Sequence, residues 1–351
     1  MYSSLLSIGS AFIKIGYVMV AILILMLMIT IHELGHYTAG KILKFKINEF
    51  SIGFGKAIFT KKKKNGEVFS IRLIPLGGYC AFEGEDTENE NPDSFNAQAP
   101  WKRLIVLFCG AFFNFLSAII FSVILLSVVG NGQVQVTALD TASNTHIETL
   151  QVGDVITHVN GEKISFFNGG LTGLTQEIKD ETDISLTVVR NGEKQEVIVQ
   201  KYATMVDGKE SYKFGIDPLN VGLPFGEAVL QSVPFSCETA WECLVVLGKL
   251  IIGDYGLEAV GGPITTIGTI ADAGSVSALY LLLYMPLIAV NLAVFNLLPI
   301  PALDGAKMVF VLIEWIRKKP INRDLENKIH MVGLIILFGF VILVDLLQLF
   351  T

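Results

Sequence analysis

Two histidines four residues apart, with a glutamate directly after the first, are the residues whose types and spacing could do chemistry. His32, Glu33 and His36 belong to the sequence HELGH, which ends an apolar run from Ile15 to Ile31. Side chains at i and i+4 share one helix face, so both imidazoles can reach one Zn²⁺, and the glutamate can take a proton from a water molecule beside the metal. A chance match is the alternative, but ionisable side chains are costly in hydrocarbon and usually mark a functional site.

A third metal ligand has to come from another part of the chain. The residues that would continue the helix after His36, from 37 to 41, contain no glutamate or histidine. The better candidate is Asp304, which closes an uncharged stretch beginning at Ala273 and should therefore lie at the same membrane level as the HELGH. Two histidines and one aspartate would leave the fourth zinc position open for water. In the alternative interpretation, Asp304 only caps a new helix after two prolines.

These side chains must be positioned by membrane helices. Hydrophobic residues make up 52% of the 351 residues, charged residues only 17%, and the mean hydropathy is +0.56. Four segments are long and apolar enough to cross about 30 Å of hydrocarbon. They are Ile15 to Ile31 continuing into the HELGH helix, Leu104 to Val129, Ala278 to Ile300 and Met331 to Phe350. The first lacks a basic n-region, so we interpret it as a retained span, not as a signal peptide.

The distribution of charge predicts the orientation of these spans. Lysines and arginines gather between the first and second spans and between the third and fourth, so both loops should be cytosolic. The segment 131–220 would then lie outside, and its thirteen acidic and seven basic residues argue against nucleic acid as a partner. The run Lys61 to Lys64 could bind anionic lipid or nucleic acid, but a solvated cytosolic turn is the simpler interpretation.

The outer segment is predicted to fold as one soluble domain. Alternating apolar residues meet Asn-Gly turns at Asn160 and Asn191, which is a strong hairpin signal, and a short helix can form from Leu171 to Ile178. The block from Gly153 to Gly161, G-D-x-I-x-x-V-N-G, resembles a PDZ domain, whose groove accepts an extended peptide by β-augmentation. A strand-rich spacer without a ligand is the alternative.

The segment after the outer domain and the cysteines carry weaker signals. Pro224 to Ile252 mixes apolar and charged residues with Trp241, which predicts a helix at the outer membrane interface. The four cysteines follow no C-x-x-C pattern, so neither a structural disulfide nor a second zinc site is indicated, although a bridge between Cys237 and Cys243 stays open as an alternative.

Two motifs in this order carry a family resemblance. HELGH in a first transmembrane helix, followed far along the chain by N-x-x-P-x-P-x-L-D-G from Asn296 to Gly305, resembles the site-2 protease family of intramembrane zinc metalloproteases. The bacterial regulator-of-sigma-E protease type, with a single PDZ domain, is the most similar branch. Further blocks that resemble the family are Gly53-Phe54-Gly55, Pro75 to Tyr79, and Gly110 with Asn114. Lys56, Ala111 and Ala306 depart from the usual proline, proline and glycine, and none of them removes a catalytic group.

The resemblance implies roles for particular residues. One Zn²⁺ is bound by His32, His36 and Asp304, and Glu33 is the catalytic base. The substrate-binding residues are Asn296, Pro299 and Pro301. A transmembrane substrate must be unwound locally before attack, and the strand-like segment Phe69 to Phe82 could pair with it while the Asn296 amide satisfies a freed backbone group.

The resemblance also implies a cellular setting. It places the chain as a multi-pass protein in the bacterial cytoplasmic (inner) membrane. The PDZ-like domain would be extracytoplasmic, where the resemblance implies either peptide binding or a size filter over the membrane entrance. The expected substrates are single-pass membrane proteins or peptides, such as an anti-sigma factor or a signal-peptide remnant, cleaved within their transmembrane segments, and an upstream site-1 protease is a further expected partner. A proteolytically inactive scaffold and a zinc transporter are the rival classes; the first would lose the ligands, and the second needs no glutamate between two of them.

The expected fold class is therefore a polytopic α-helical membrane protein with about four transmembrane helices, a membrane-associated β-hairpin region and an inserted PDZ-like α+β domain. The predicted parts are 1–45, the first transmembrane helix with HELGH; 46–100, the cytosolic β region; 101–130, the second transmembrane helix; 131–215, the PDZ-like domain; 216–275, an interfacial helix and loop; 276–310, the third transmembrane helix with the second motif; and 311–351, a cytosolic loop and the fourth transmembrane helix.

Overall fold

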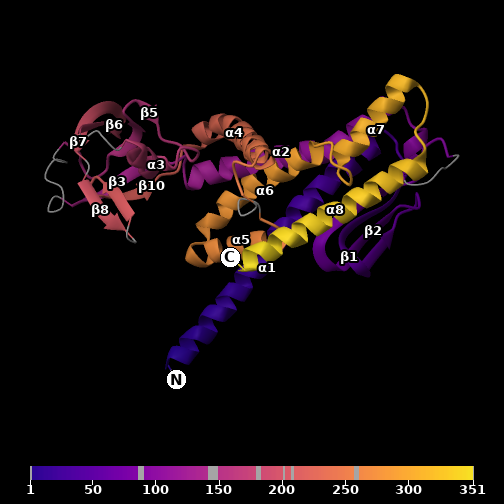
Figure 1. The fold of residues 1–351 in the computed structure, drawn as a ribbon, viewed down its shortest axis with the longest axis horizontal. Coiled ribbons are helices and arrows are strands. Elements are labelled where there is room, and N and C mark those ends of the chain that lie inside the picture. The colour runs from indigo at the N-terminus through magenta and orange to yellow at the C-terminus, as the bar shows by residue number, and fades with distance from the viewer. Residues whose placement is uncertain are drawn as a thin grey trace. The chain divides into compact units, whose positions relative to one another are not determined.

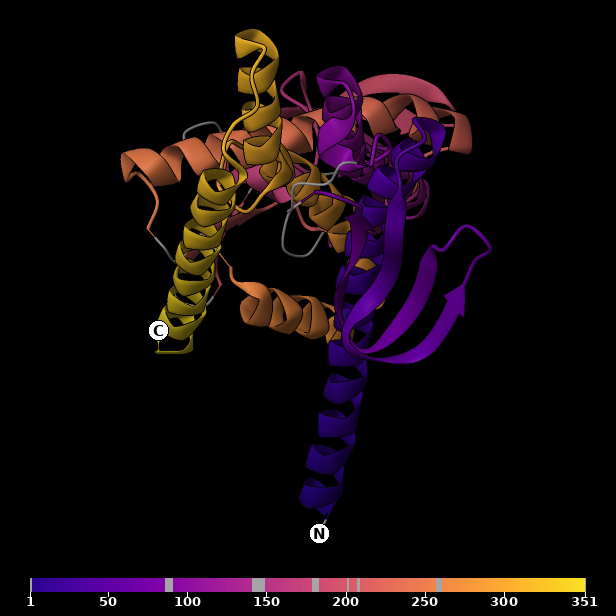
Figure 2. The same cartoon turned by 90° about the vertical axis from the view of Figure 1, so that its right-hand side faces the viewer.

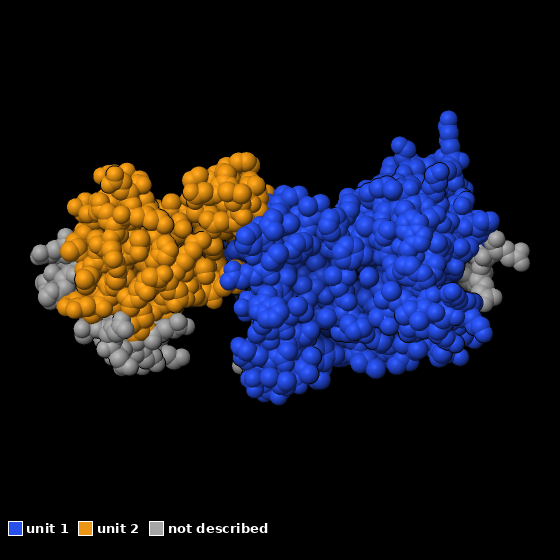
Figure 3. Space-filling view, turned by 90° about the horizontal axis from the view of Figure 1, so that it is seen from above, with its two compact units in different colours: residues 1–121, 233–351 blue, residues 122–232 orange. Residues whose placement is uncertain are grey.

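A computed structural model of the chain describes residues 2–85, 91–140, 149–178, 183–200, 202–206, 209–256 and 261–350. Two compact units are present (Figure 3). The first unit consists of residues 1–121 and 233–351, and the second unit consists of residues 122–232.

Four helices of the described chain are long and apolar enough to cross a membrane (Figure 1). They are α1 (Tyr2–Ile42), α2 (Pro100–Val128), α6 (Leu279–Leu297) and α8 (Arg323–Phe350). Their number agrees with the four spans expected from the sequence, and it identifies the chain as an integral membrane protein.

A shorter helix, α5 (Pro263–Val276), packs against both α1 and α6. Met28 of α1, Ile270 of α5 and Ala289 of α6 are fully buried in one apolar cluster. The sequence analysis expected a loop before the third span, and the structure has this helix instead. Pro263 is compatible with this helix, because it occupies the first helical turn, where its missing N–H is not needed.

The β region is one long antiparallel hairpin of β1 (Ile47–Lys62) and β2 (Val68–Phe82). Figure 2 shows it as a bent ribbon beside α1. Its register shifts where Gly53 and Gly55 adopt positive φ angles of 86° and 81°, and such bulges bend a strand pair. The packing of Phe45, Phe82 and the short 3₁₀ helix η1 (Phe95–Ala97) holds the base of the hairpin against α1.

The tip of the hairpin is fixed to α1 by Glu67. Its carboxylate is buried and accepts hydrogen bonds from Lys41 and Tyr37 of α1 and from Lys63, which directly follows β1. Burial acts to raise the pKa of Glu67, but the hydrogen bonds outweigh it and lower the pKa to about 2. The carboxylate is therefore ionised at neutral pH and ties the hairpin to the helix.

A further helix, α7 (Asp304–Arg317), follows α6 after a short turn. Arg103 of α2 donates to Glu314 of α7 at 2.5 Å, and Lys307 donates to Glu85 at 2.7 Å. The sequence analysis expected a cytosolic loop from residue 311, whereas α7 continues to Arg317 and only a short link precedes α8.

The second unit is built around a six-stranded sheet with the order β10-β3-β4-β6-β7 and β5 paired to β4. The bounds are β3 (Val134–Leu139), β4 (Val155–Val159), β5 (Glu162–Lys163), β6 (Asp183–Arg190), β7 (Glu193–Gln200), β10 (Ile216–Asn220) and the helix α3 (Gly170–Glu177); β8 (Tyr202–Val206) and β9 (Lys209–Lys213) form a separate pair. Asn160, Gly161, Asn191 and Gly192 all have positive φ, as expected for the two hairpin turns.

The two ends of this unit meet. The Val221 N–H donates to the Gln133 carbonyl at 3.2 Å, and the Leu223 N–H donates to the Leu126 carbonyl at 2.8 Å. The chain therefore leaves α2 and returns at the same place, as an inserted domain does. It continues into α4 (Phe225–Ile252), and Cys237 and Cys243, like the other two cysteines, are free.

Candidate metal centre

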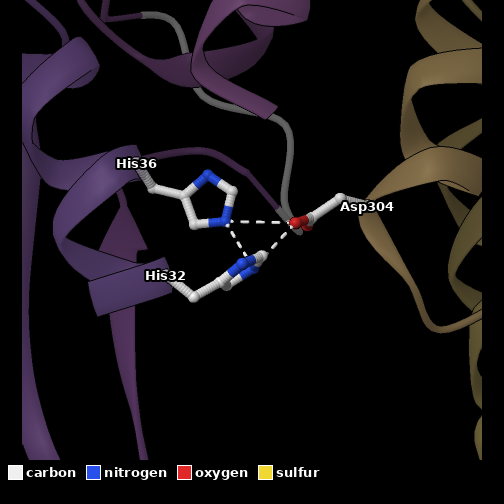
Figure 4. A group of neighbouring side chains, drawn as sticks. All are labelled: His32, His36 and Asp304. Atoms are coloured by element: carbon white, nitrogen blue, oxygen red, sulfur yellow. Dashed lines mark hydrogen bonds and ion pairs between the residues drawn. The ribbon is translucent and has the colours of Figure 1, made fainter. Parts of the chain in front are cut away.

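The two histidines of HELGH lie one turn apart on the same face of α1 and are both buried. Their Nε2 atoms are 3.1 Å apart, and the ring planes are nearly perpendicular, at 86°. Figure 4 shows both imidazoles pointing to one centre, together with the carboxylate of Asp304. The structure thus brings together the three residues that the sequence analysis chose as ligands.

Asp304 reaches this centre from the start of α7. A turn from Ile300 to Leu303 lies between α6 and α7, with Ala302 at a φ of 85° and the Leu303 N–H bonded to the Ile300 carbonyl at 3.1 Å. The Asp304 side chain points to the two histidines: its Oδ2 lies 3.0 Å from His32 Nε2 and 3.1 Å from His36 Nε2.

The three atoms fit a zinc ion. A tetrahedral Zn²⁺ with ligands at about 2.0–2.1 Å separates those ligands by about 3.3–3.4 Å, close to the 3.0–3.1 Å edges of this triangle. His36 Nδ1 donates to the Val106 carbonyl at 2.8 Å, so the Nε2 of the neutral ring carries a lone pair. Lone pairs of Nε2 and of a carboxylate oxygen repel at this separation unless a proton or a metal cation lies between them, and nitrogen and oxygen donors suit Zn²⁺.

The centre opens into a cavity of about 510 Å³. Glu33 lines it and accepts a hydrogen bond from the backbone N–H of Cys80 in β2. Burial and the nearby carboxylate of Glu33 raise the pKa of the Cys80 thiol, which therefore stays protonated and is a poor metal ligand. Because Glu33 directly follows His32 in α1, its carboxylate lies beside the three candidate ligands.

Two walls of the cavity come from different elements. Residues Tyr79 to Phe82 of β2 form one wall, and Leu292 and Asn296 of α6 contribute to another. Cys80 pairs with Phe50 of β1 on one side of the strand, while its N–H reaches Glu33 on the other. The edge of β2 that faces the cavity is thus the one not paired with β1.

The three substrate-binding residues expected from the resemblance are placed differently from one another. Asn296 lines the cavity, with its Nδ2 donating to the Leu292 carbonyl at 2.9 Å. Pro299 is exposed, and Pro301 packs against Gly333 of α8. Within the described chain, neither proline lines the cavity.

Helix α2 supports the two imidazoles, which the sequence reasoning did not anticipate. Gly35 of α1 and Gly110 of α2 allow the two helices to approach closely, because a Cβ at Gly35 would lie 2.7 Å from the Cys109 carbonyl carbon. A Cβ at Gly110 would lie 2.7 Å from His32 Cε1. Asn114 Nδ2 lies 3.3 Å from His32 Nδ1, one turn beyond Gly110. The i, i+4 spacing of Gly110 and Asn114 was the available signal, whereas the carbonyl of Val106 has none.

Comparison with known proteins gives the same family across the chain. The family model described as peptidase family M50 matches residues 20–340. A Helicobacter pylori protein named "Putative zinc metalloprotease" is 33% identical over 355 residues, covering 95% of this chain and 97% of its own length. Similarly named proteins of Fusobacterium nucleatum and Clostridium perfringens are each 29% identical, covering 93% and 94% of this chain and 96% and 97% of their own.

Proposed function

This chain belongs to peptidase family M50, the site-2 protease family, and from that premise we propose that it is an intramembrane zinc endopeptidase that cleaves transmembrane segments of membrane-anchored substrates. The observation that carries the proposal is the triangle of His32, His36 and Asp304, with Glu33 beside it, open to a cavity. These four residues belong to the unit that contains α1, α6 and α8.

The ligand set assigns a role to each residue. His32, His36 and Asp304 hold the metal, which when bound polarises a scissile carbonyl and makes water more acidic. Glu33 takes the proton of the attacking water and delivers it to the leaving amine. The Cys80 N–H orients the Glu33 carboxylate by the hydrogen bond that it donates. A zinc transporter would have no use for a base held in this way.

The cavity walls suggest how the substrate is held. A transmembrane helix keeps its amides in internal hydrogen bonds, so it must unwind before attack. The edge of β2 at Tyr79 to Phe82 that does not pair with β1 can take an extended segment as an added strand, through backbone groups other than the Cys80 N–H that bonds Glu33. The Asn296 amide, now bonded within its own helix, can turn to satisfy a freed backbone group of the substrate.

The charge distribution supports an orientation. Lysines of the hairpin and of the segment that follows α7 favour the cytosol for both, by the positive-inside rule. The acidic second unit then lies outside the bacterial cytoplasmic membrane as a PDZ-like domain. The lipid bilayer and a single-pass membrane protein or peptide are the expected partners, the latter after a first cut by a site-1 protease, and nucleic acid is not expected.

Exchange of the base tests the catalytic assignment. The protein is reconstituted with a transmembrane peptide substrate, and Glu33→Gln should retain about one zinc per chain but lose cleavage by a factor of about 10² to 10⁴ or more. Glu242→Gln, an exposed glutamate of α4, is the matched control and should cleave as the wild type does. Substantial cleavage by Glu33→Gln would refute the mechanism.

A further inference from the structure

Asn114 is a fully buried residue of α2, and only one end of its side-chain amide has a polar partner in the described chain. Its Nδ2 lies 3.3 Å from Nδ1 of His32, and its Oδ1 is buried with no hydrogen-bond partner in the described chain. A buried amide without a partner is costly, so a specific reason is expected for keeping one here. The residue that it touches is a candidate metal ligand.

The proton of the His32 ring decides how this amide must face. Nε2 of His32 points to His36 and Asp304 and can bind a metal only through a lone pair, so the proton of the neutral ring must be on Nδ1. An Nδ1–H needs an acceptor, and the NH₂ group of an amide offers none. The C=O and NH₂ groups of an Asn side chain have nearly the same shape. A half-turn of the amide would bring Oδ1 to His32 Nδ1 and leave Nδ2 without a partner, so the number of unpartnered groups stays at one.

His36 has the arrangement that His32 requires, an Nδ1–H that donates to an oxygen acceptor. His36 Nδ1 donates to the Val106 carbonyl at 2.8 Å, which holds the lone pair of Nε2 toward the centre. Val106, Gly110 and Asn114 follow at intervals of four residues and share one face of α2. Gly110, in the middle, leaves room for both rings. One helix face can therefore fix both imidazoles.

We propose that Asn114 is the positioning residue of His32, with its Oδ1 accepting the Nδ1–H and so holding the Nε2 lone pair toward the zinc site. This inference rests on the proposed function, because it concerns the same metal centre. It gives Asn114 a role in metal affinity, without contact with the substrate or the reacting water.

Zinc affinity of the purified full chain, measured by competition with a chelator, tests the proposal without any protease assay. Asn114→Leu keeps the volume but removes the acceptor, and it should weaken zinc binding by a factor of about 10 to 100. Asn114→Asp supplies acceptors only and should restore the affinity to within a few-fold of wild type. Ser117→Ala, which removes another buried polar group of α2, is the matched control and should bind normally.

Several outcomes would overturn the role of Asn114. A folded Asn114→Leu with wild-type zinc affinity would do so, as would an Asn114→Asp that binds as weakly as Asn114→Leu. If Asn114→Leu fails to fold, ¹⁵N NMR of the zinc-loaded wild type decides, because a proton on Nε2 of His32 would contradict the proposal and one on Nδ1 is expected. Zinc binding that does not depend on His32 at all would instead refute the metal centre and the proposed function.

Discussion

Among single residues, Gly110 is the glycine at which an added Cβ would meet both imidazoles of the metal centre. Gly110→Ala would place a Cβ 2.7 Å from His32 Cε1 and against the ring of His36, so both imidazoles would have to turn away. We expect the zinc affinity to fall by at least about tenfold. The helix content should be unchanged or higher, because alanine favours helices. Gly268→Ala in α5, where a Cβ would meet nothing within 4 Å, is the control for circular dichroism and zinc content.

A substitution of Asp304 can distinguish its two candidate roles, metal ligand and helix cap. Asp304→Ala should lower zinc occupancy and cleavage together, because its Oδ2 is the third corner of the ligand triangle. Asp324→Ala is the matched control. It removes an exposed aspartate from the first turn of α8, so it has the effect of losing an acidic residue at a helix start without the loss of a metal ligand. Equal zinc content in Asp304→Ala and Asp324→Ala would return Asp304 to the role of a helix-start residue.

The residues of this centre differ in how visible they are in the sequence. HELGH and Asp304 stand out because charged side chains in apolar segments are rare, and the family resemblance that they carried is confirmed by the match over residues 20–340. Val106 acts through its carbonyl, and every residue has one. Its role, and that of the Cys80 N–H, follows only from the packing of α2 and β2 against α1.

At the scale of elements, the attachment of the hairpin to α1 should depend on pH. The folded-state pKa of Glu67 is about 2, below its ordinary value of 4.5, so the unfolded chain binds more protons between these values. The stability that Glu67 contributes is complete above about pH 4.5 and is lost as the pH falls toward 2. Glu67→Gln should flatten this part of the profile of unfolding free energy against pH; an unchanged profile would contradict the role of the carboxylate. Glu193→Gln, at an exposed glutamate, is the control.

Elements were predictable where their signals are local. The Asn-Gly turns give two hairpins of the second unit because positive φ at both turn positions needs these residue types. Helix α5 was missed because its residues 263–276 include two glycines and several β-branched residues, and its stability comes from packing on α1 and α6. The part of helix α7 after residue 310 was interpreted as a loop because its buried contacts, such as Glu314 with Arg103, connect positions far apart in the chain.

At the scale of the whole molecule, the centre and the inserted domain belong to different units. His32, Glu33, His36 and Asp304 all lie in the first unit, and within the second unit the Val221 N–H donates to the Gln133 carbonyl at 3.2 Å, where the chain enters and leaves the sheet. A chain that leaves and returns at one point can lose the insertion with little strain on the helices that flank it. This predicts that metal binding does not need the second unit.

Excision of residues 134–220, with a short glycine-containing linker from Gln133 to Val221, tests this independence. The shortened protein should keep about one zinc per chain and should cleave a pre-trimmed transmembrane substrate with full dependence on Glu33. If the domain excludes substrates by size, the excision should also admit an untrimmed substrate with a bulky outer domain. If the domain captures a new C-terminus by β-augmentation, the excision should slow the trimmed substrate and never admit the untrimmed one. A folded, zinc-loaded product that cleaves neither would refute both versions and make the domain part of the catalytic unit.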